Sequence, residues 1–327
     1  MEITVTNAND LFAEMFWRFK VYGDPVKTRN GPALRMPEPV LTQVDLPLER
    51  VLFHSGRDAN PIFHLLESIW MLAGRRDVEF LQRFNSKIGQ YSDDGEVFNA
   101  AYGHRMRWHF GVDQLTEVIK TLRSDPESRQ AVIQLWDAQD LSKKTRDKAC
   151  NTQLVFEVYE GMLNMTVFNR SNDAWFGYAG ANIVHMTVIQ EFVAYAVGVP
   201  VGRYRTFSTN LHLYTEMYAA EPLVHRPPSR EEYDCYLLGE AAPTPLIVSG
   251  SYESFLSECH KFCSEPFNTE HEYLHPFFNH VAVPMAMVSR VRKLGAGDGR
   301  GWAAKIRASD WRRAVFDWIE RREAVKA

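Results

Sequence analysis

The feature that most constrains the fold is a pair of alternating segments joined by a short turn. Residues 154–159 and 162–169 alternate apolar and polar side chains on either side of a Glu-Gly pair, which predicts two antiparallel strands connected by a tight turn. Cys150 precedes the first strand and Arg170 follows the second, so both should lie at the same end of the hairpin. A thiol beside an anion-binding guanidinium is suited to covalent chemistry on a phosphorylated substrate.

Other periodic segments predict a mixed α/β fold of the α+β type, in which a sheet has helices on one side. Apolar residues recur at helical spacing in four segments, and strand-like runs lie on both sides of the hairpin. The expected helices span about residues 8–21, 60–73, 113–124 and 181–197, and the expected strands lie near 130–136, 153–159, 162–169 and 202–210.

Composition favours a globular enzyme without a membrane segment. With 327 residues and 45% hydrophobic side chains, the chain can bury a large core. A formal net charge of −4 gives no general attraction for nucleic acid or for an anionic membrane. The first residues lack the basic and apolar regions of a secretory leader, so a cytoplasmic location is expected. Four cysteines are too few for a disulfide scaffold.

Two patterns in the last third of the chain have ordinary structural interpretations. Cys259 and Cys263 lie in a helical pattern without a second ligand pair elsewhere, so we expect packing there and no metal site. After residue 284 the chain becomes basic, and Trp311, Val315 and Trp318 recur at helical spacing. This spacing predicts a terminal amphipathic helix docked on the core, with a nucleic-acid contact as the alternative.

Cys150 alone is an ambiguous candidate, since most cysteines are structural and a nucleophile needs a favourable environment. Arg146, Lys148 and Arg170 flank it in the expected fold and would lower the pKa of its thiol. These cations favour a nucleophile without establishing one.

A set of short motifs occurs in a fixed order over residues 20–220. They are Thr28-Arg29-Asn30-Gly31, Glu67-x-x-Trp70-x-Leu72-x-Gly74, Ala101-Tyr102-Gly103, Ser128-Arg129, Cys150, Arg170-Ser171-x-Asp173, Asn182-Ile183 and His212-Leu213-Tyr214. Together they resemble the thymidylate synthase family. The resemblance implies a mixed sheet with helices, in a homodimer whose active sites are shared between subunits. Residues 1–283 would form the catalytic domain, and residues 284–327 a basic extension packed on the same domain.

The resemblance implies covalent catalysis by Cys150. Its sulfur would add to carbon 6 of a pyrimidine nucleoside monophosphate, which makes carbon 5 a nucleophile toward the methylene group of 5,10-methylenetetrahydrofolate. Glu67 would organise proton transfer beside the base, and Tyr102 would help remove the carbon 5 proton. The apolar neighbours of Glu67 argue against a surface ion pair, whereas Tyr102 without the resemblance would be an ordinary half-buried tyrosine.

The resemblance also assigns the phosphate contacts, because Arg forks match phosphate oxygens and a hydroxyl adds a short donor. Arg29, Arg170 and Ser171 would come from one subunit and Arg129 from the other. Any one of these arginines alone would be explained by a surface ion pair.

The remaining matched residues would contact the rest of the substrate and the folate. His212 and Tyr214 alternate onto one face of a strand and would bind the sugar hydroxyl. Asn182 would read the base, and Asp173 resembles the carboxylate of the family that contacts folate. The amide of Asn182 has both a donor and an acceptor, so it does not choose between uracil and cytosine.

Departures from the family pattern bear on the substrate. Gln130 stands where the family has a second Arg, Asn151 replaces a His after the nucleophile, and Asn210 replaces a carboxylate. The loop at residues 177–182 is one residue longer and carries small residues, which would admit another sugar or base orientation. Deoxycytidylate hydroxymethylases usually carry Asp at the position of Asn182, and cytidylate hydroxymethylases of nucleoside-antibiotic pathways also belong to this family.

Two further departures favour entry of water over hydride transfer. The segment at residues 87–91 lacks the tryptophans of typical thymidylate synthases, and the chain ends after a long basic extension instead of a short apolar one. We therefore predict folate-dependent 5-hydroxymethylation of CMP or dCMP. The alternatives are methylation of dUMP and a noncatalytic nucleotide- or RNA-binding relative, although binding alone requires none of Cys150, Glu67 and Tyr102.

Overall fold

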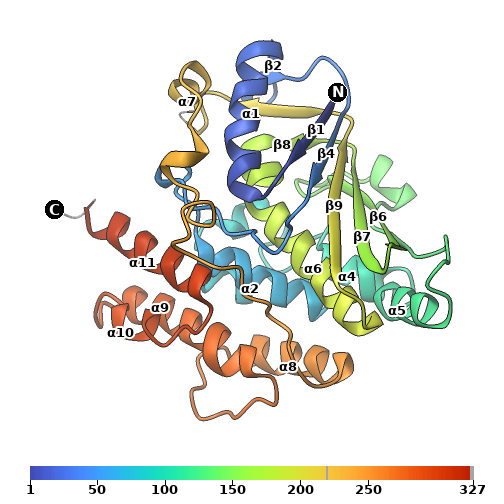
Figure 1. Cartoon of the computed structure of the whole chain (residues 1–327), viewed down its shortest axis with the longest axis vertical. Helices are drawn as coiled ribbons and strands as arrows, with labels where there is room; N and C mark the ends of the chain where they lie inside the picture. Colours follow the sequence, from blue (N-terminus) through green and yellow to red (C-terminus); the bar gives the residue numbers. More distant parts are fainter. Residues whose placement is uncertain (219, 325–327) are drawn as a thin grey trace.

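A computed structural model describes residues 1–218 and 220–324. Its centre is a six-stranded mixed sheet with strand order β1-β4-β9-β7-β6-β5, and Figure 1 shows the main helices on one side of it. The pairs β1–β4 and β7–β9 are parallel, and the other neighbours are antiparallel. The strands span Glu2–Val5 (β1), Val40–Val44 (β4), Val132–Gln134 (β5), Asn151–Tyr159 (β6), Met162–Asn169 (β7) and Val201–Ser208 (β9).

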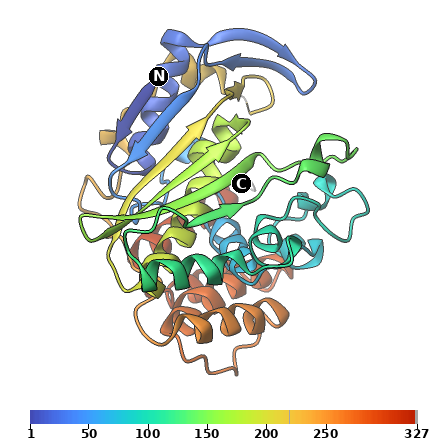
Figure 2. The same cartoon turned by 90° about the vertical axis from the view of Figure 1, so that its right-hand side faces the viewer.

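The two faces of this sheet differ in burial because side chains alternate along each strand. The cross-strand row that contains Leu154, Val167 and Thr206 is buried beneath the helices. The next row, which contains Val155 and Thr166, is half-buried and points away from them. Figure 2 looks onto this second face, and no helix covers it there.

A smaller sheet lies beside the first, in the order β2-β3-β10-β8. Its first two strands form an extended hairpin, drawn in blue at the top of Figure 2. The strands are Asp24–Thr28 (β2), Gly31–Arg35 (β3), Asn172–Asp173 (β8) and Leu211–Tyr214 (β10).

Helices cover the inner face of the large sheet and continue into a layer at the end of the chain. Between β8 and α6 the chain forms a π-helical segment, Ala174–Ala181 (η5), which is interrupted at Ala179 and Gly180. The α-helices are Ala8–Tyr22 (α1), Pro61–Leu72 (α2), Val78–Gln82 (α3), Tyr102–His104 (α4), Gln114–Ser124 (α5), Asn182–Val197 (α6), Glu221–His225 (α7), Tyr252–Ser264 (α8), Val283–Lys293 (α9), Arg300–Ala303 (α10) and Ser309–Ala324 (α11).

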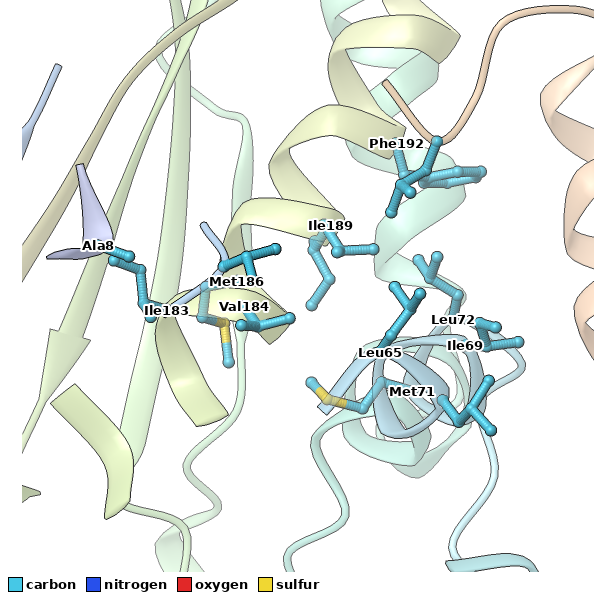
Figure 3. Close-up of a cluster of buried hydrophobic side chains, with 14 of the residues drawn as sticks. Ala8, Leu65, Ile69, Met71, Leu72, Ile183, Val184, Met186, Ile189 and Phe192 are labelled. Atoms are coloured by element: carbon cyan, nitrogen blue, oxygen red, sulfur yellow. The ribbon is translucent and has the colours of Figure 1, made fainter. Parts of the chain in front are cut away.

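The centre of the core is the contact between α2 and α6. Figure 3 shows Leu65 and Ile69 of α2 facing Ile189 and Phe192 of α6, and all four side chains are at most 1% exposed. Both helices are apolar almost all round, which is typical of helices buried on every side. Polar residues on these two helices are therefore conspicuous.

The C-terminal helices α8, α9 and α11 pack against α2 on the side away from the sheet. Trp311 and Val315 of α11 are buried, and Trp318 packs against the same core. The predicted amphipathic helix docked on the core is thus confirmed, while residues 325–327 lie outside the described part of the chain. Cys259 and Cys263 are buried within α8 and pack in the core.

The mixed α/β class with helices on one side of a sheet is confirmed, and so are all four predicted helices and all four predicted strands. The smaller sheet was not predicted, because its strands have only two to five residues. Among the described residues, no helix combines the length and apolar character needed to cross a bilayer.

Candidate active site

The hairpin of β6 and β7 brings Cys150 and Arg170 together, as predicted. The Arg170 backbone N–H donates to the Cys150 carbonyl over 3.0 Å. The guanidinium donates from Nε to the Ala149 carbonyl at 2.7 Å, and its Nη2 lies 3.8 Å from the Cys150 sulfur. Arg170 therefore both fixes the loop before Cys150 and places its charge beside the thiol.

Arg170 lowers the pKa of the Cys150 thiol, as expected, but burial has the larger and opposite effect. Burial raises the pKa of Cys150 above its ordinary value, and Arg170 and Arg29 oppose this effect only in part. Arg146 is exposed at the surface, and the largest effects of cations on the thiol pKa come from Arg170 and Arg29. Desolvation of the thiolate outweighs the attraction of the nearby cations.

Tyr102 holds the backbone on both sides of the nucleophile. Its hydroxyl oxygen accepts the backbone N–H groups of Cys150 at 3.1 Å and Asn151 at 3.2 Å. Burial raises the pKa of this phenol, so the hydroxyl keeps its proton and remains free to donate it. Gly103 follows directly, and a side chain there would meet the Met71 carbonyl oxygen at 2.1 Å. This close approach sets Tyr102 against α2.

Glu67 lies on α2 beside two histidines that sequence reasoning did not identify. The Nε2 atom of His185, on α6, is 3.2 Å from Oε2 of Glu67. His64 lies one turn before Glu67, and its ring is 6.4 Å from the His185 ring in an edge-to-face arrangement. Burial lowers the pKa of His64 well below its ordinary value. The available signal was spacing, since His185 is three residues after Asn182 and His64 three residues before Glu67.

Asn182 begins α6 close to the Arg170-Ser171 step. A side chain at Gly177 would lie 2.7 Å from Oδ1 of Asn172 and 3.0 Å from Nδ2 of Asn182, so these two amides meet across the glycine. Ser171 is half-buried immediately before Asn172. Asn182 therefore lies close to Asn172, the residue that follows Ser171 in the chain.

Asp173 belongs to an aromatic wall next to these residues. Its Oδ1 caps η5 by accepting the backbone N–H of Trp175 at 2.9 Å, and its Oδ2 accepts the Tyr218 hydroxyl at 2.6 Å. The Tyr218 and Trp175 rings stack with centroids 5.5 Å apart. Arg57 donates to the Trp175 carbonyl at 3.0 Å, and burial lowers its pKa to about 10. Arg57, Trp175 and Tyr218 had no recognisable sequence signal.

The small residues of the loop at 177–182 have a packing explanation. A side chain at Gly180 would lie 2.8 Å from Nη2 of Arg57 and 2.6 Å from the Trp175 carbonyl oxygen. Ala179 and Ala181 are buried. The space that the sequence suggested for another sugar or base is therefore occupied in part by Arg57.

His212 and Tyr214 share a face of β10, as expected, and their rings meet edge to face at 5.0 Å. Asn210, which stands where the family has a carboxylate, places its Oδ1 3.0 Å from Nδ1 of His212. Asn30 donates to the Tyr214 hydroxyl at 3.2 Å. This bond brings the β2–β3 turn, and with it Arg29, toward the site.

Tyr91 lies near the candidate site residues, whereas Arg129 lies far from them. Tyr91, which ends the tryptophan-free segment, is 46% exposed and contributes to the raised pKa of Tyr218. Arg129, by contrast, is exposed in a surface hollow before β5. Because Val132 pairs with Val155 in antiparallel register, Arg129 lies about eight residues along β6 from Cys150, or roughly 26 Å. Arg129 thus does not join this site within one chain.

Asn151 is fully buried after the nucleophile, and neither polar atom of its amide has a hydrogen-bond partner among the described residues. Within the same part of the chain, no three His, Cys, Asp or Glu side chains converge in a way that would hold a metal ion. The grouped chemistry is therefore a thiol, a carboxylate, imidazoles and guanidinium groups.

Comparisons with known proteins identify the family and the relatives of this chain. The family model described as thymidylate synthase matches residues 57–234. A deoxyuridylate hydroxymethyltransferase from Pseudomonas phage M6 is 41% identical over 339 aligned residues, which cover 99% of this chain and 95% of the relative. Proteins of the same name from Bacillus phage SP01 and Delftia phage PhiW-14 are 38% and 31% identical, over 61% and 60% of this chain and 55% and 57% of their own lengths.

Proposed function

Because the chain belongs to the thymidylate synthase family, whose members are one-carbon transferases, we propose that it converts dUMP to 5-hydroxymethyl-dUMP. The co-substrate is 5,10-methylenetetrahydrofolate. The observation that carries the proposal is the hairpin end, where Cys150 is fixed by Tyr102 and faced by Arg170. The names of the phage relatives support hydroxymethyl transfer to deoxyuridylate.

Uracil is preferred here to the cytosine bases that the sequence favoured. The preference comes from the names of the phage relatives, and the Asn182 amide suits uracil in the orientation in which its carbonyl accepts the N–H at ring nitrogen 3 and its NH₂ group donates to oxygen 4. The packing of Gly180 against Arg57 removes the argument for a ribonucleotide that rested on a roomy loop. CMP and dCMP remain the second candidates, because a flipped Asn182 amide suits cytosine.

Reactivity at Cys150 comes from position more than from an ionised thiol. The raised pKa leaves little thiolate at neutral pH, so attack on carbon 6 depends on holding the sulfur against the base. Tyr102 does this through two backbone bonds and has a hydroxyl proton free for transfer near carbon 5. Glu67 supports proton transfer on the other side of the base, toward α6.

The remaining candidates bind the substrate and folate. Arg29, Arg170 and Ser171 hold the phosphate, and His212 with Tyr214 binds the sugar hydroxyl. Asp173 and the stacked Tyr218 and Trp175 rings face the folate. These roles follow the family pattern residue by residue, and the contacts between neighbouring elements support them.

The open face of the large sheet supports a homodimer. Val132 and Val155 pair on this face, as do Phe168 and Phe207, and Figure 2 shows no helix over the face. The same face also carries polar residues, among them the ion pair of Arg205 with Glu157, and an uncovered sheet face of this kind is suited to association with a second copy. In such a dimer, Arg129 reaches the phosphate of the neighbouring subunit.

Incubation with methylene-tetrahydrofolate and each of dUMP, dCMP, CMP and UMP, followed by mass spectrometry of the nucleotide, tests the proposal. We expect a hydroxymethyl group on dUMP and conversion of the folate to tetrahydrofolate, because no hydride is consumed. The Cys150→Ala variant should bind dUMP but leave every nucleotide unchanged.

The same assay identifies the alternatives. Methylated dUMP with an equal amount of dihydrofolate, seen by its absorbance, would show a thymidylate synthase. Hydroxymethylation of dCMP or CMP alone would restore the cytosine assignment.

A further inference from the structure

The contact between His185 and Glu67 has no assigned role, and it joins α6 to α2, the two largely apolar helices whose packing is shown in Figure 3. We infer that His185 is a positioning residue that orients Glu67 to take a proton from the water molecule that adds to the exocyclic methylene. This inference rests on the proposed hydroxymethyl transfer and specifies which residues direct water to the reacting carbon.

A purely structural role for His185 is disfavoured, because burying its imidazole costs free energy of desolvation. The residue is 3% exposed on α6, and its neighbours Val184, Met186 and Ile189 are buried apolar side chains. A buried imidazole loses water contacts that a leucine or alanine at the same position would not need. Its Nε2 atom is buried and has no well-aligned hydrogen bond among the described residues, although it lies 3.2 Å from the Glu67 carboxylate.

A close but poorly aligned contact is what a site without substrate often shows. Hydrogen bonds between catalytic groups commonly tighten only when the substrate is bound. A small rotation lets the Nε2–H of His185 donate to Oε2 of Glu67, and this leaves Oε1 as the proton acceptor. His64 also lies beside the His185 ring, since the two rings meet edge to face.

Glu67 and His185 are connected to Cys150 through neighbouring residues of α2, α4 and α6. Glu67 is one helical turn from Met71, against which Gly103 packs, and Tyr102 next to it bonds to the Cys150 backbone. On α6, His185 is one turn from Asn182. A base held between Cys150 and Asn182 would therefore have its reactive edge toward the carboxylate.

The proposed step balances without an oxidant or reductant. The water oxygen bonds to the exocyclic methylene carbon, the π electrons move onto carbon 5 and oxygen 4, and a water proton passes to Glu67. The electron pair then re-forms the double bond between carbons 5 and 6, and the bond from carbon 6 to the Cys150 sulfur breaks. The proton on Glu67 returns to that sulfur or to solvent.

Two quantities measured on the same sample test the inference. Release of tritium from carbon 5 of labelled dUMP reports every step up to loss of that proton, and 5-hydroxymethyl-dUMP reports water capture. The ratio of product to tritium should be close to one in the unmodified enzyme. In His185→Leu it should fall about tenfold, a fraction of the roughly 10²–10⁴-fold effect of general-base catalysis, and the methylene adduct on Cys150 should accumulate in the intact-protein mass spectrum.

Matched variants separate orientation from packing. His185→Gln places an amide N–H near the position of Nε2 and should retain most of the ratio, whereas the shorter His185→Asn should not. His275→Gln removes another buried histidine, 2% exposed and bonded to Ser254 in the C-terminal layer, and should leave the ratio unchanged. If His185→Leu does not fold, the comparison of Gln with Asn decides the question.

The inference fails if the His185 variants lose tritium release and product in equal proportion, since that result indicates only a structural role. It also fails if all variants keep a ratio near one. Failure of the proposed function is a different result, because the unmodified enzyme would then form no hydroxymethyl nucleotide at all.

Discussion

At the scale of single residues, the environment of Cys150 sets two effects against each other. Burial raises its thiol pKa, and Arg170 lowers it in part. The thiolate is the charged form, so its fraction is small at neutral pH and grows as the pH rises toward the raised pKa. Alkylation by iodoacetamide should therefore keep accelerating above pH 9.0, the ordinary thiol value.

Replacing Arg170 tests the sign of its contribution. Arg170→Gln should move the alkylation profile of Cys150 to higher pH, while Arg170→Lys should move it less. Peptide mass spectrometry assigns the modification to Cys150 and excludes the three buried cysteines. A plateau in the rate below pH 8 would contradict the dominance of burial.

Gly177 offers a second prediction at this scale. An added methyl group would meet the amides of Asn172 and Asn182 at 2.7 and 3.0 Å, and both are ends of side chains that can shift. Gly177→Ala should therefore displace Asn182 and raise KM for the nucleotide about tenfold, equivalent to about 1.4 kcal/mol. Gly301→Ala is the control, because nothing lies within 4 Å of its added carbon. An unchanged KM with altered melting temperature would remove Asn182 from base recognition.

The site residues that could be predicted from sequence are those next to each other in the chain or across one hairpin. Cys150 and Arg170 meet through local pairing, so alternation and a turn were enough to bring them together. His185, Arg57 and Tyr218 were missed because their partners come from other helices and loops. Their roles depend on packing between elements, which leaves no periodic pattern in the sequence.

At the scale of elements, α11 is attached to the turn that carries Arg57. Arg321 and Arg322 donate to Oδ1 of Asp58 at 3.0 and 2.7 Å, and Asp58 follows Arg57 in a left-handed conformation. Arg57 in turn supports the Trp175 carbonyl. The last helix is therefore linked to the aromatic wall proposed for folate through a short series of direct contacts.

Removing both arginines should weaken this link more than it weakens the fold. Exposed ion pairs contribute about 0–1 kcal/mol each, so Arg321→Ala/Arg322→Ala should lower the melting temperature only slightly. KM for the folate should rise a few-fold, while KM for dUMP stays nearly constant. Arg313→Ala is the control, because Arg313 also lies on α11 and forms ion pairs with Asp317 of the same helix and with Glu240. This change should alter neither of the two KM values. Equal effects on the KM for folate and the KM for dUMP would contradict a specific link between α11 and the aromatic wall.

Helices and long strands were predictable because periodicity accumulates over many residues. The nine residues of β6 and the eleven of α5 each show a clear repeat. The strands of the smaller sheet are too short for this, and β8 has only two residues. Their pairing depends on the hairpin at residues 24–35 and on β10, which pairs with β3 on one side and with β8 on the other.

At the scale of the whole molecule, buried residues from Ile3 to Ile319 belong to one hydrophobic cluster. We propose that residues 284–324 are part of the same folding unit as residues 1–283, since α9 and α11 both pack against α2. Deleting the extension would expose the apolar surface of Trp311 and Val315 together with the part of the core that they cover. A cooperative single unfolding transition in the full chain agrees with this proposal, and two separate transitions would oppose it.

The separation of Arg129 from Cys150 leads to a prediction about subunit exchange. If each site takes Arg129 from the neighbouring subunit, a mixture of Arg129→Ala and Cys150→Ala chains contains heterodimers with one intact site. Random pairing makes half of the dimers mixed, so about one quarter of full activity should return. Mixing Cys150→Ala with Arg170→Ala should restore nothing, because Arg170 contacts Cys150 of its own chain and every site keeps a defect. If exchange is demonstrated by mass spectrometry and the first mixture stays inactive, Arg129 does not act across the interface.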